Sequence, residues 1–293
     1  MSVTETQHDS VHEAREPGWS HFRLERRNSS YWRVTFDNPP INTITATTVA
    51  ELSELVELIE QDETLNVVVF DSSNPDFFLA HYDVEGDPSK TAALPDGPTG
   101  LPSWLDLTVR LSRANVVSIA SIRGRARGAG SEFVLACDIR LASRENAVLG
   151  QFEVGSGFVP GGGPMARLSR LVGRGRALEI LMVGDDIDGP RAELYGYVNR
   201  AIADADLDAE VERIAHRLSG FDHEAIARTK AHVDVATLPP ESELPPALED
   251  FRASFSRAGP PARLARLEQL GLNHDGDLER NLGVRVAESG EGS

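Results

Sequence analysis

The feature of this sequence that most constrains its fold is the alternation of short apolar runs with longer segments whose apolar residues recur at helical spacing. Thr45 is a predicted N-cap, and residues 49–59 carry apolar side chains on one helical face before the apolar run 67–70. Similar runs follow at 116–122 and 139–142, separated by a glycine-rich turn and an apolar helical segment. Continuous apolar runs are typical of strands buried on both faces of a parallel sheet. The alternation therefore predicts an α/β core.

The chain of 293 residues divides by composition into four parts. Residues 1–20 are polar and lack periodicity, which predicts a mobile N-terminal tail, and residues 284–293 predict a second tail. Residues 21–203 carry the α/β pattern, whereas residues 204–283 show only amphipathic helices. Within the core, residues 87–101 are rich in Pro, Gly and Asp and predict an irregular, mobile loop. We therefore expect an α/β core with a helical C-terminal appendage.

Charge and cysteine content narrow the possible partners. The formal net charge is −17, from 46 acidic and 29 basic residues, which disfavours binding to nucleic acid or to anionic membranes. Because Cys137 is the only cysteine, the chain has no intrachain disulfide and no thiolate metal cluster. The N-terminus lacks the apolar stretch of a secretory signal, and no apolar run approaches the length of a membrane span. We expect a cytoplasmic protein.

The glycine-rich segment 124–133 lies between a predicted strand and a predicted helix, where nucleotide-binding loops occur. From Gly128 it reads G-A-G-S-E-F and lacks the third small residue of a dinucleotide-binding fingerprint. The P-loop pattern G-x-x-x-x-G-K-[ST], the serine-hydrolase pattern G-x-S-x-G and the zinc-protease pattern H-E-x-x-H do not occur in the chain. What remains is a strand, a tight turn and a helix with Glu132 in its first turn.

The start of that helix can serve either of two purposes. Its unpaired N–H groups and partial positive charge can stabilise an anion that develops on a ligand oxygen, and the small residues at 128–130 allow close approach to the backbone. Alternatively, the glycines only form a tight turn and Glu132 is an ordinary carboxylate at a helix start. This segment by itself leaves both interpretations open.

Five segments, in order along the chain, resemble motifs of the enoyl-CoA hydratase/isomerase (crotonase) family. The run 118–139 is similar to A-x-x-G-x-A-x-G-G-G-x-E followed after four residues by C-D, with Glu132 at the glutamate position. The other segments are similar to the F-x-A-G-x-D loop at 78–84, the F-G-Q-P-E segment at 149–154, the G-x-[IV]-P-G-x-G turn at 157–163 and the stretch 175–200 that ends in G-L-V-N. Together they cover roughly residues 22–235.

The resemblance implies a crotonase-like ββα spiral core and an enzyme that acts on an acyl-CoA thioester. The backbone N–H groups of the family's oxyanion hole match Tyr82 and Ala129, and the two glutamates of its hydratases match Glu132 and Glu153. Two carboxylates around one water can supply a base and a proton donor. The resemblance places seven further residues around the substrate: Ala80, His81, Asp83, Gly128, Gly130, Pro160 and Gly161. It implies no metal and no organic cofactor apart from the coenzyme A of the substrate.

The matching segments depart from the family pattern at several positions. His81 stands where glycine is usual, Tyr82 where a small residue is usual, and Ala129 replaces a glycine of the oxyanion hole. A side chain at position 129 requires a negative φ. Phe152 replaces the proline beside Glu153, and one extra residue separates the two glutamates. These departures leave open the direction in which the Glu153 side chain points and the roles of His81 and Tyr82.

Several interpretations of function remain. The first is hydration of a 2-enoyl-CoA by two glutamates; an isomerase, hydrolase, decarboxylase or C–C lyase of the same family would use the same oxyanion hole. A non-catalytic acyl-thioester-binding or scaffold protein is the alternative from another class. The resemblance also implies a homotrimer or a dimer of trimers, in which Phe251 and Phe255 suit a face against a neighbouring subunit. Arg123, Arg125 and Arg127 surround the glycine turn and could meet CoA phosphates.

Overall fold

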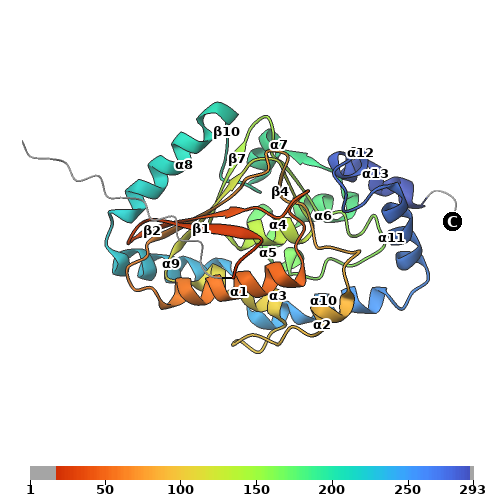
Figure 1. Cartoon of the computed structure of the whole chain (residues 1–293), viewed down its shortest axis with the longest axis horizontal. Coiled ribbons are helices and arrows are strands. Elements are labelled where there is room, and N and C mark those ends of the chain that lie inside the picture. Colours follow the sequence, from red (N-terminus) through yellow and green to blue (C-terminus); the bar gives the residue numbers. More distant parts are fainter. Residues whose placement is uncertain (1–17, 291–293) are drawn as a thin grey trace, which may run out of the picture.

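A six-stranded sheet runs through the middle of the molecule (Figure 1). The computed structural model describes residues 18–290. The strand order is β1-β2-β3-β5-β7-β10; β1 and β2 form an antiparallel hairpin, and the other neighbouring pairs are parallel. The strands are β1 Phe22–Asn28, β2 Tyr31–Phe36, β3 Val67–Ser72, β5 Val117–Ile122, β7 Ile139–Ser143 and β10 Arg200–Ile202. The predicted apolar runs are the inner strands β3, β5 and β7, which confirms the α/β class.

A second, smaller sheet has the order β4-β6-β8-β9. Its strands are β4 Phe77–Leu79, β6 Arg125–Arg127, β8 Val148–Gly150 and β9 Ile187–Asp188. The first three are parallel to one another, and β9 is antiparallel to β8. Strands of two or three residues are too short to show a period of two, so the sequence pattern did not predict this sheet.

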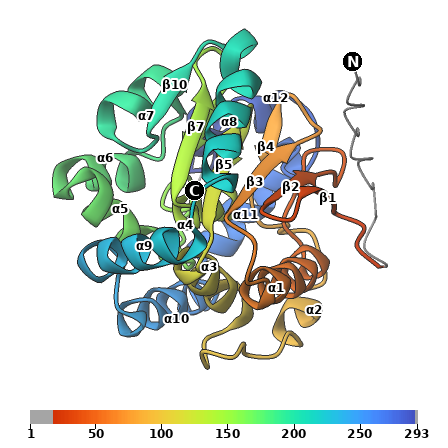
Figure 2. The ribbon, with the colours of Figure 1, turned by 90° about the vertical axis from the view of Figure 1, so that its left-hand side faces the viewer.

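Helices cover the sheets and form the C-terminal part of the chain. The first seven are α1 Ala46–Gln61, α2 Pro88–Ala92, α3 Ser103–Arg113, α4 Ala129–Ala136, α5 Pro164–Val172, α6 Arg174–Val183 and α7 Gly189–Tyr195. The others are α8 Asp204–Ser219, α9 His223–Thr237, α10 Pro245–Ser254, α11 Gly259–Leu270, α12 Asp277–Arg280 and α13 Leu282–Arg285, with 3-10 helices at Glu241–Glu243 and Val286–Gly290. Figures 1 and 2 place α8 and the α11–α13 group at opposite ends of the molecule. In the described range 18–290, no helix is long and apolar enough to cross a bilayer.

The two faces of the large sheet are buried by different helices, because successive side chains of a strand point to opposite faces. Val68 and Phe70 of β3 belong to the main hydrophobic core, which includes side chains of α1, α3 and α4. Val67 and Val69 pack in a second cluster with side chains of α8. The parallel sheet is therefore covered on both sides, as its continuous apolar runs require.

The described parts of both predicted tails pack against the rest of the protein. Residues 1–17 and 291–293 lie outside the described residues. Trp19, assigned to the first tail, is buried, and its indole N–H donates to Glu54 Oε2 at 2.8 Å. At the other end, α13 and the following 3-10 helix contain residues 284–290, and Val286 is buried. Single large apolar residues anchor these segments, and isolated residues give no periodicity. The predicted irregular loop 87–101 likewise contains α2.

Candidate active site

Three loops meet at one edge of the small sheet. Strands β4, β6 and β8 are parallel neighbours, so the loops that follow them leave the sheet at the same edge. These loops are residues 80–83, 128–132, which includes the first turn of α4, and 151–153. Each lies within one of the matching family motifs. The carboxyl edge of parallel strands is a usual place for a ligand site in α/β proteins. The short sheet thus brings together segments that are far apart in the sequence.

The backbone N–H groups of Tyr82 and Ala129 lie on adjacent loops beyond β4 and β6. The two loops stay side by side because the Arg127 N–H donates to the carbonyl oxygen of Ala80, which is buried, at 3.0 Å. Among the described residues, neither the Tyr82 N–H nor the Ala129 N–H has a hydrogen-bond acceptor. Ala129 is not in the left-handed region, so its methyl group is compatible with the turn. Two unpaired donors on neighbouring loops can bind one oxygen anion.

Gly128 forms the turn between β6 and α4, and the three loops come together around it. Its φ is +50°, a conformation that favours glycine. A Cβ at this position would lie 3.1 Å from Glu153 Oε1, 3.1 Å from Phe152 Cε1 and 3.5 Å from His81 Cβ. Gly130, in the first turn of α4, rests against the backbone of β4. The predicted glycine positions therefore lie at the centre of the site.

Glu132 is buried in the first turn of α4, and both of its carboxylate oxygens accept a hydrogen bond. Trp104 Nε1 donates to Oε2 and the Gly162 N–H donates to Oε1, each at 2.8 Å. Burial raises the pKa of Glu132, and this effect exceeds the opposite effects of the two donors and of Arg167. The two donors fix the orientation of the carboxylate and favour its ionised form.

Glu153 lies in the loop after β8 and is partly buried. Burial, and then the nearby charge of Glu132, raise its pKa to about 8. With its amide nitrogen toward Glu153, the Gln151 side chain donates to both carboxylate oxygens at 3.0 Å and accepts from Ser131 Oγ at 3.1 Å. The extra residue between the two glutamates therefore does not carry Glu153 out of electrostatic reach of Glu132.

The turn 157–163 supports Glu132 from the other end of the site. Pro160 is buried, and a Cβ on Gly161 would lie 3.0 Å from Phe251 Cβ of α10. A Cβ on Gly162 would lie 1.8 Å from Glu132 Oε2, so the hydrogen bond from its N–H requires glycine. Sequence reasoning singled out Pro160 and Gly161 but missed Gly162.

Trp104 is the second residue that the sequence reasoning missed. It lies in α3, outside the five segments that resemble family motifs. Its indole N–H donates to Glu132 Oε2 at 2.8 Å. An indole N–H on a partly buried side chain usually has a specific acceptor, and this general rule was the available indication. Nothing in the sequence identified Glu132 as that acceptor.

Two predicted substrate contacts are instead engaged within the protein. His81 is buried, and its ring nitrogens lie 2.7 Å from Tyr82 O and 2.7 Å from Glu279 Oε1. Neither nitrogen is free for a ligand, which corrects the prediction that His81 binds the substrate. Asp83 Oδ1 accepts from two N–H groups of its own loop and from Asn273 Nδ2 at 2.9 Å. Asp83 therefore orients its loop, as aspartates commonly do in turns.

The three arginines around the glycine turn are also engaged within the protein. Arg123 Nε donates to Asp204 Oδ1 at 2.8 Å, and Arg125 Nε donates to a backbone carbonyl of α12 at 3.0 Å. Arg127 is 1% exposed and donates twice to the Asp186 carboxylate, each time at 2.7 Å. These contacts do not support the prediction that the three side chains meet CoA phosphates, and burial excludes it for Arg127.

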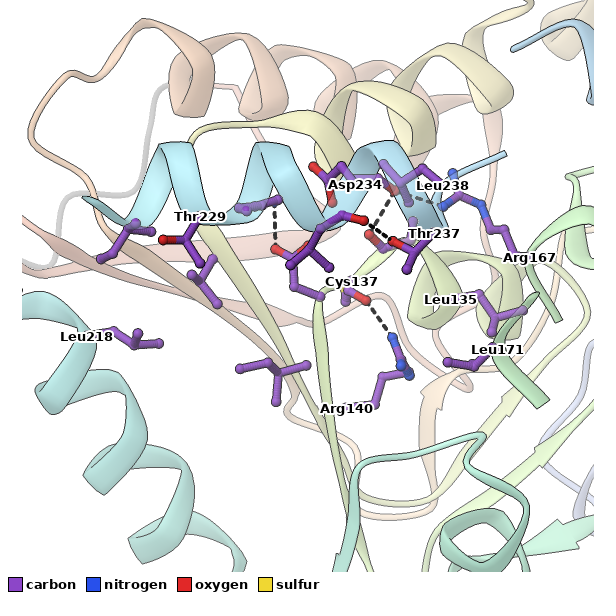
Figure 3. Close-up of a pocket in the computed structure, with 18 of the residues that line it drawn as sticks. Leu135, Cys137, Arg140, Arg167, Leu171, Leu218, Thr229, Asp234, Thr237 and Leu238 are labelled. Carbon is purple, nitrogen blue, oxygen red and sulfur yellow. Dashed lines mark hydrogen bonds and ion pairs between the residues drawn. The ribbon is translucent and has the colours of Figure 1, made fainter. Parts of the chain in front are cut away.

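A cavity of about 970 Å³ lies beside α9 (Figure 3). Apolar side chains of α4, α8 and α9 and of the neighbouring strands form most of its surface. Cys137 and charged side chains also line it, among them Asp138, Arg140, Arg167 and Lys230. Burial raises the pKa of the Cys137 thiol to about 12. Neither Glu132 nor Glu153 lines this cavity. The two carboxyl groups therefore lie in the segments that follow β6 and β8, and the cavity is a separate feature of the molecule.

Comparisons with known proteins agree with this arrangement. A family model described as enoyl-CoA hydratase/isomerase matches residues 26–249. The crotonyl-CoA hydratase of Syntrophomonas wolfei is 32% identical over 200 residues, which cover 68% of this chain and 76% of that protein. A solved structure from Streptomyces avermitilis, described as a candidate enoyl-CoA hydratase, has a TM-score of 0.87 and 40% identity, covering 92% of this chain and 98% of that one. Pseudomonas aeruginosa DspI has a TM-score of 0.69 and 26% identity, with 82% and 97% covered. This chain has the crotonase-type fold and belongs to the enoyl-CoA hydratase/isomerase family of enzymes.

Proposed function

We propose that this enzyme adds water across the double bond of a 2-enoyl-CoA thioester, with Glu132 and Glu153 as the catalytic pair. The observation that carries the proposal is that two carboxyls in different environments lie on adjacent loops beside two unpaired backbone N–H groups. The names of the relatives support this reaction, since the matching Syntrophomonas wolfei protein is a crotonyl-CoA hydratase.

The environments of the two glutamates assign their roles. Glu153, with a pKa raised to about 8, is protonated at neutral pH and can give a proton to the substrate. Burial raises the pKa of Glu132 as well, but its two N–H donors oppose this and favour the carboxylate, so we assign Glu132 as the base. Pairs of carboxyls whose environments separate their pKa values are typical of acid–base catalysis.

The proposed reaction follows from these roles. Glu132 takes a proton from water while the water oxygen bonds to the β-carbon, and the electrons of the double bond move onto the thioester oxygen. The N–H groups of Tyr82 and Ala129 stabilise the resulting enolate. Glu153 then protonates the α-carbon, and proton exchange with solvent restores both glutamates. The scheme needs no metal ion and no organic cofactor beyond the coenzyme A of the substrate.

The test is the loss of enoyl-thioester absorbance with crotonyl-CoA and with a longer 2-enoyl-CoA. Glu132→Gln and Glu153→Gln are each expected to lower kcat by about 10²–10⁴-fold, because each removes one proton-transfer group. Glu193→Gln is the matched control, since Glu193 is exposed on α7 and outside the site. Wild-type turnover that survives both site substitutions would contradict the two-glutamate mechanism.

The alternatives give different results in the same assay. A double-bond isomerase would tolerate the loss of one glutamate and would convert a 3-enoyl-CoA without adding water. A hydrolase would release free CoA thiol. A non-catalytic acyl-thioester-binding or scaffold protein would bind the thioester with no turnover of any substrate. Product analysis by mass separates hydration from these reactions.

We also propose that the chain self-associates, as a homotrimer or a dimer of trimers. Helix α9 buries none of its residues within the chain. Val233 and Val235 are exposed, and Val233 lines the cavity of Figure 3. Exposed apolar side chains next to an apolar cavity are typical of an interface. Sedimentation velocity should show the oligomer for wild type and a smaller species for the double variant Val233→Glu, Val235→Glu. A monomeric wild type would overturn the proposal.

A further inference from the structure

The segment 272–290 covers two of the three loops of the site. Phe152 packs in one hydrophobic cluster with Leu278 of α12 and Leu282 of α13. Asn273 Nδ2 donates to Asp83 Oδ1 at 2.9 Å, which ties the same segment to the loop that contains Tyr82. Between these two contacts lies the His81–Glu279 pair, in which both side chains are almost completely buried. The C-terminal segment therefore contacts the site through a charged group as well as by packing.

The hydrogen-bond partners of His81 determine the number of protons on the pair. Tyr82 O, 2.7 Å from Nδ1, is a carbonyl oxygen and can only accept. Glu279 Oε1, 2.7 Å from Nε2, also accepts from the Asn273 N–H at 2.8 Å. Burial is the largest single effect on the pKa of His81 and lowers it, as does the charge of Arg127. The charge and hydrogen bond of Glu279, together with the hydrogen bond to the Tyr82 carbonyl, outweigh these effects and leave the pKa raised. The arrangement is that of an imidazolium that donates one proton to each partner.

The charged groups around the pair are compatible with this state. Burial raises the pKa of Glu279, but the charge and hydrogen bond of His81, the Asn273 N–H and the charge of Arg127 together outweigh it and leave the pKa lowered. Arg127 Nη1 donates to the backbone carbonyl of Glu279 at 2.6 Å, while its own charge is balanced by Asp186. The imidazolium and the guanidinium therefore each face a carboxylate.

The partner of Nδ1 is the carbonyl of the residue whose N–H is proposed to polarise the thioester. Ile44 pairs with the groups on either side of Tyr82: its N–H donates to His81 O and its carbonyl accepts from the Asp83 N–H, both at 2.8 Å. In extended backbone, the N–H and C=O of one residue point to the same side, opposite to those of its neighbours. The Tyr82 N–H and C=O thus both point away from Ile44. The N–H is unpaired, and the C=O is held by His81.

We propose that His81 and Glu279 are positioning residues that set the direction of the Tyr82 N–H in the oxyanion hole. Glu279 holds the second proton of the imidazole, and this leaves the Nδ1 proton committed to the Tyr82 carbonyl. The pair acts through Tyr82 and does not contact the reacting atoms. The inference rests on the proposed function in one respect, namely that the Tyr82 N–H binds the thioester oxygen.

The isosteric change Glu279→Gln tests this role. Without the carboxylate charge His81 loses its second proton, and a neutral imidazole has one N–H to divide between Tyr82 O and residue 279. Infrared spectra of bound butyryl-CoA, labelled with ¹³C at the thioester carbonyl, measure how strongly the oxyanion hole polarises that bond. In wild type the carbonyl stretch is expected to be lower than in solution. In Glu279→Gln and in His81→Ala it should return toward the solution value, with kcat for crotonyl-CoA lower by about 10- to 100-fold.

Leu278→Ala is the matched control because Leu278 is the buried neighbour of Glu279 in α12 and lies outside the pair. It should lower the melting temperature but leave the carbonyl stretch unchanged. A wild-type stretch in both Glu279→Gln and His81→Ala, or an equal change in Leu278→Ala, would overturn the inference. If wild type itself leaves the bound carbonyl unshifted, the oxyanion hole of the proposed function fails instead. The variants remain informative if crotonyl-CoA is not turned over, because butyryl-CoA needs only to bind.

Discussion

Glu132 is buried and Glu153 is partly buried, and the two differ in the groups that donate to them. Glu132 receives an indole N–H and a backbone N–H, whereas Glu153 has the Gln151 amide and the charge of Glu132 nearby. Hydrogen bonds to a charged group favour the charged form, and a neighbouring like charge disfavours it. The proposed division into base and acid thus depends partly on Trp104, which lies outside the five matching segments.

Removing the indole donor should raise the pKa of Glu132 and lower the fraction of the base that is ionised. Trp104→Phe keeps an aromatic ring but removes the N–H that donates to Glu132 Oε2. Such a bond to a charged group contributes about 1.5–3 kcal/mol, so kcat at pH 7 is expected to fall about tenfold or more. The acid limb of the pH–rate profile should move to higher pH. Trp19→Phe is the control, because the Trp19 N–H donates to Glu54 on α1. Equal effects of the two substitutions would contradict this assignment.

The raised pKa of Glu153 predicts a basic limit to activity. The proposed reaction needs its protonated form, so kcat/KM should be constant near pH 7 and fall above the pKa of about 8. In Glu132→Gln the neighbouring negative charge is gone, so the basic limb of the residual rate should move to lower pH. Glu193→Gln should retain the wild-type profile. A rate that stays constant through pH 9 would show that Glu153 is not the acid.

At the scale of elements, the sequence predicted the long strands and helices but not the small sheet. The runs that became β3, β5 and β7 are long enough to show their burial, whereas β4, β6 and β8 have three residues each. Three residues carry no measurable period, and their pairing depends on contacts with distant segments. Motif resemblance still found the loops that follow them. Glu279, in contrast, belongs to no motif, so its contact with His81 could not be predicted.

Helix α1 offers a test of a local prediction that the structure confirms. Thr45 is its N-cap: Oγ1 accepts from the Thr48 N–H at 3.2 Å, and Thr48 Oγ1 accepts from the Thr45 N–H at 3.0 Å. Thr45→Ala should lower the free energy of unfolding by about 1 kcal/mol. Thr47→Ala, at an exposed position in the same turn, should change it by less than about 0.5 kcal/mol. Urea titration checks both values, and similar losses would argue against a capping role.

At the scale of the whole molecule, the net charge of −17 opposes the approach of a polyanionic thioester. Raising the ionic strength from about 0.01 M to 0.15 M shortens the Debye length from about 30 Å to about 8 Å and screens this repulsion. The KM for crotonyl-CoA is therefore expected to fall over that range. The crotonyl thioester of N-acetylcysteamine, which lacks the phosphates, should show no such change. A KM that rises with salt would show that local cations dominate the encounter.

The close packing of Gly162 against Glu132 also bears on how this protein can evolve. Every single-nucleotide change in a glycine codon that alters the residue introduces a Cβ or a stop. At Gly162 that Cβ would overlap the carboxylate of Glu132. Every missense change at this codon is therefore expected to disturb the site. Sequence variation must therefore arise at other positions, such as Glu193, which is exposed on α7 and lies outside the site. Substitutions can accumulate at such positions, whereas Gly162, whose N–H donates to Glu132, is expected to stay glycine.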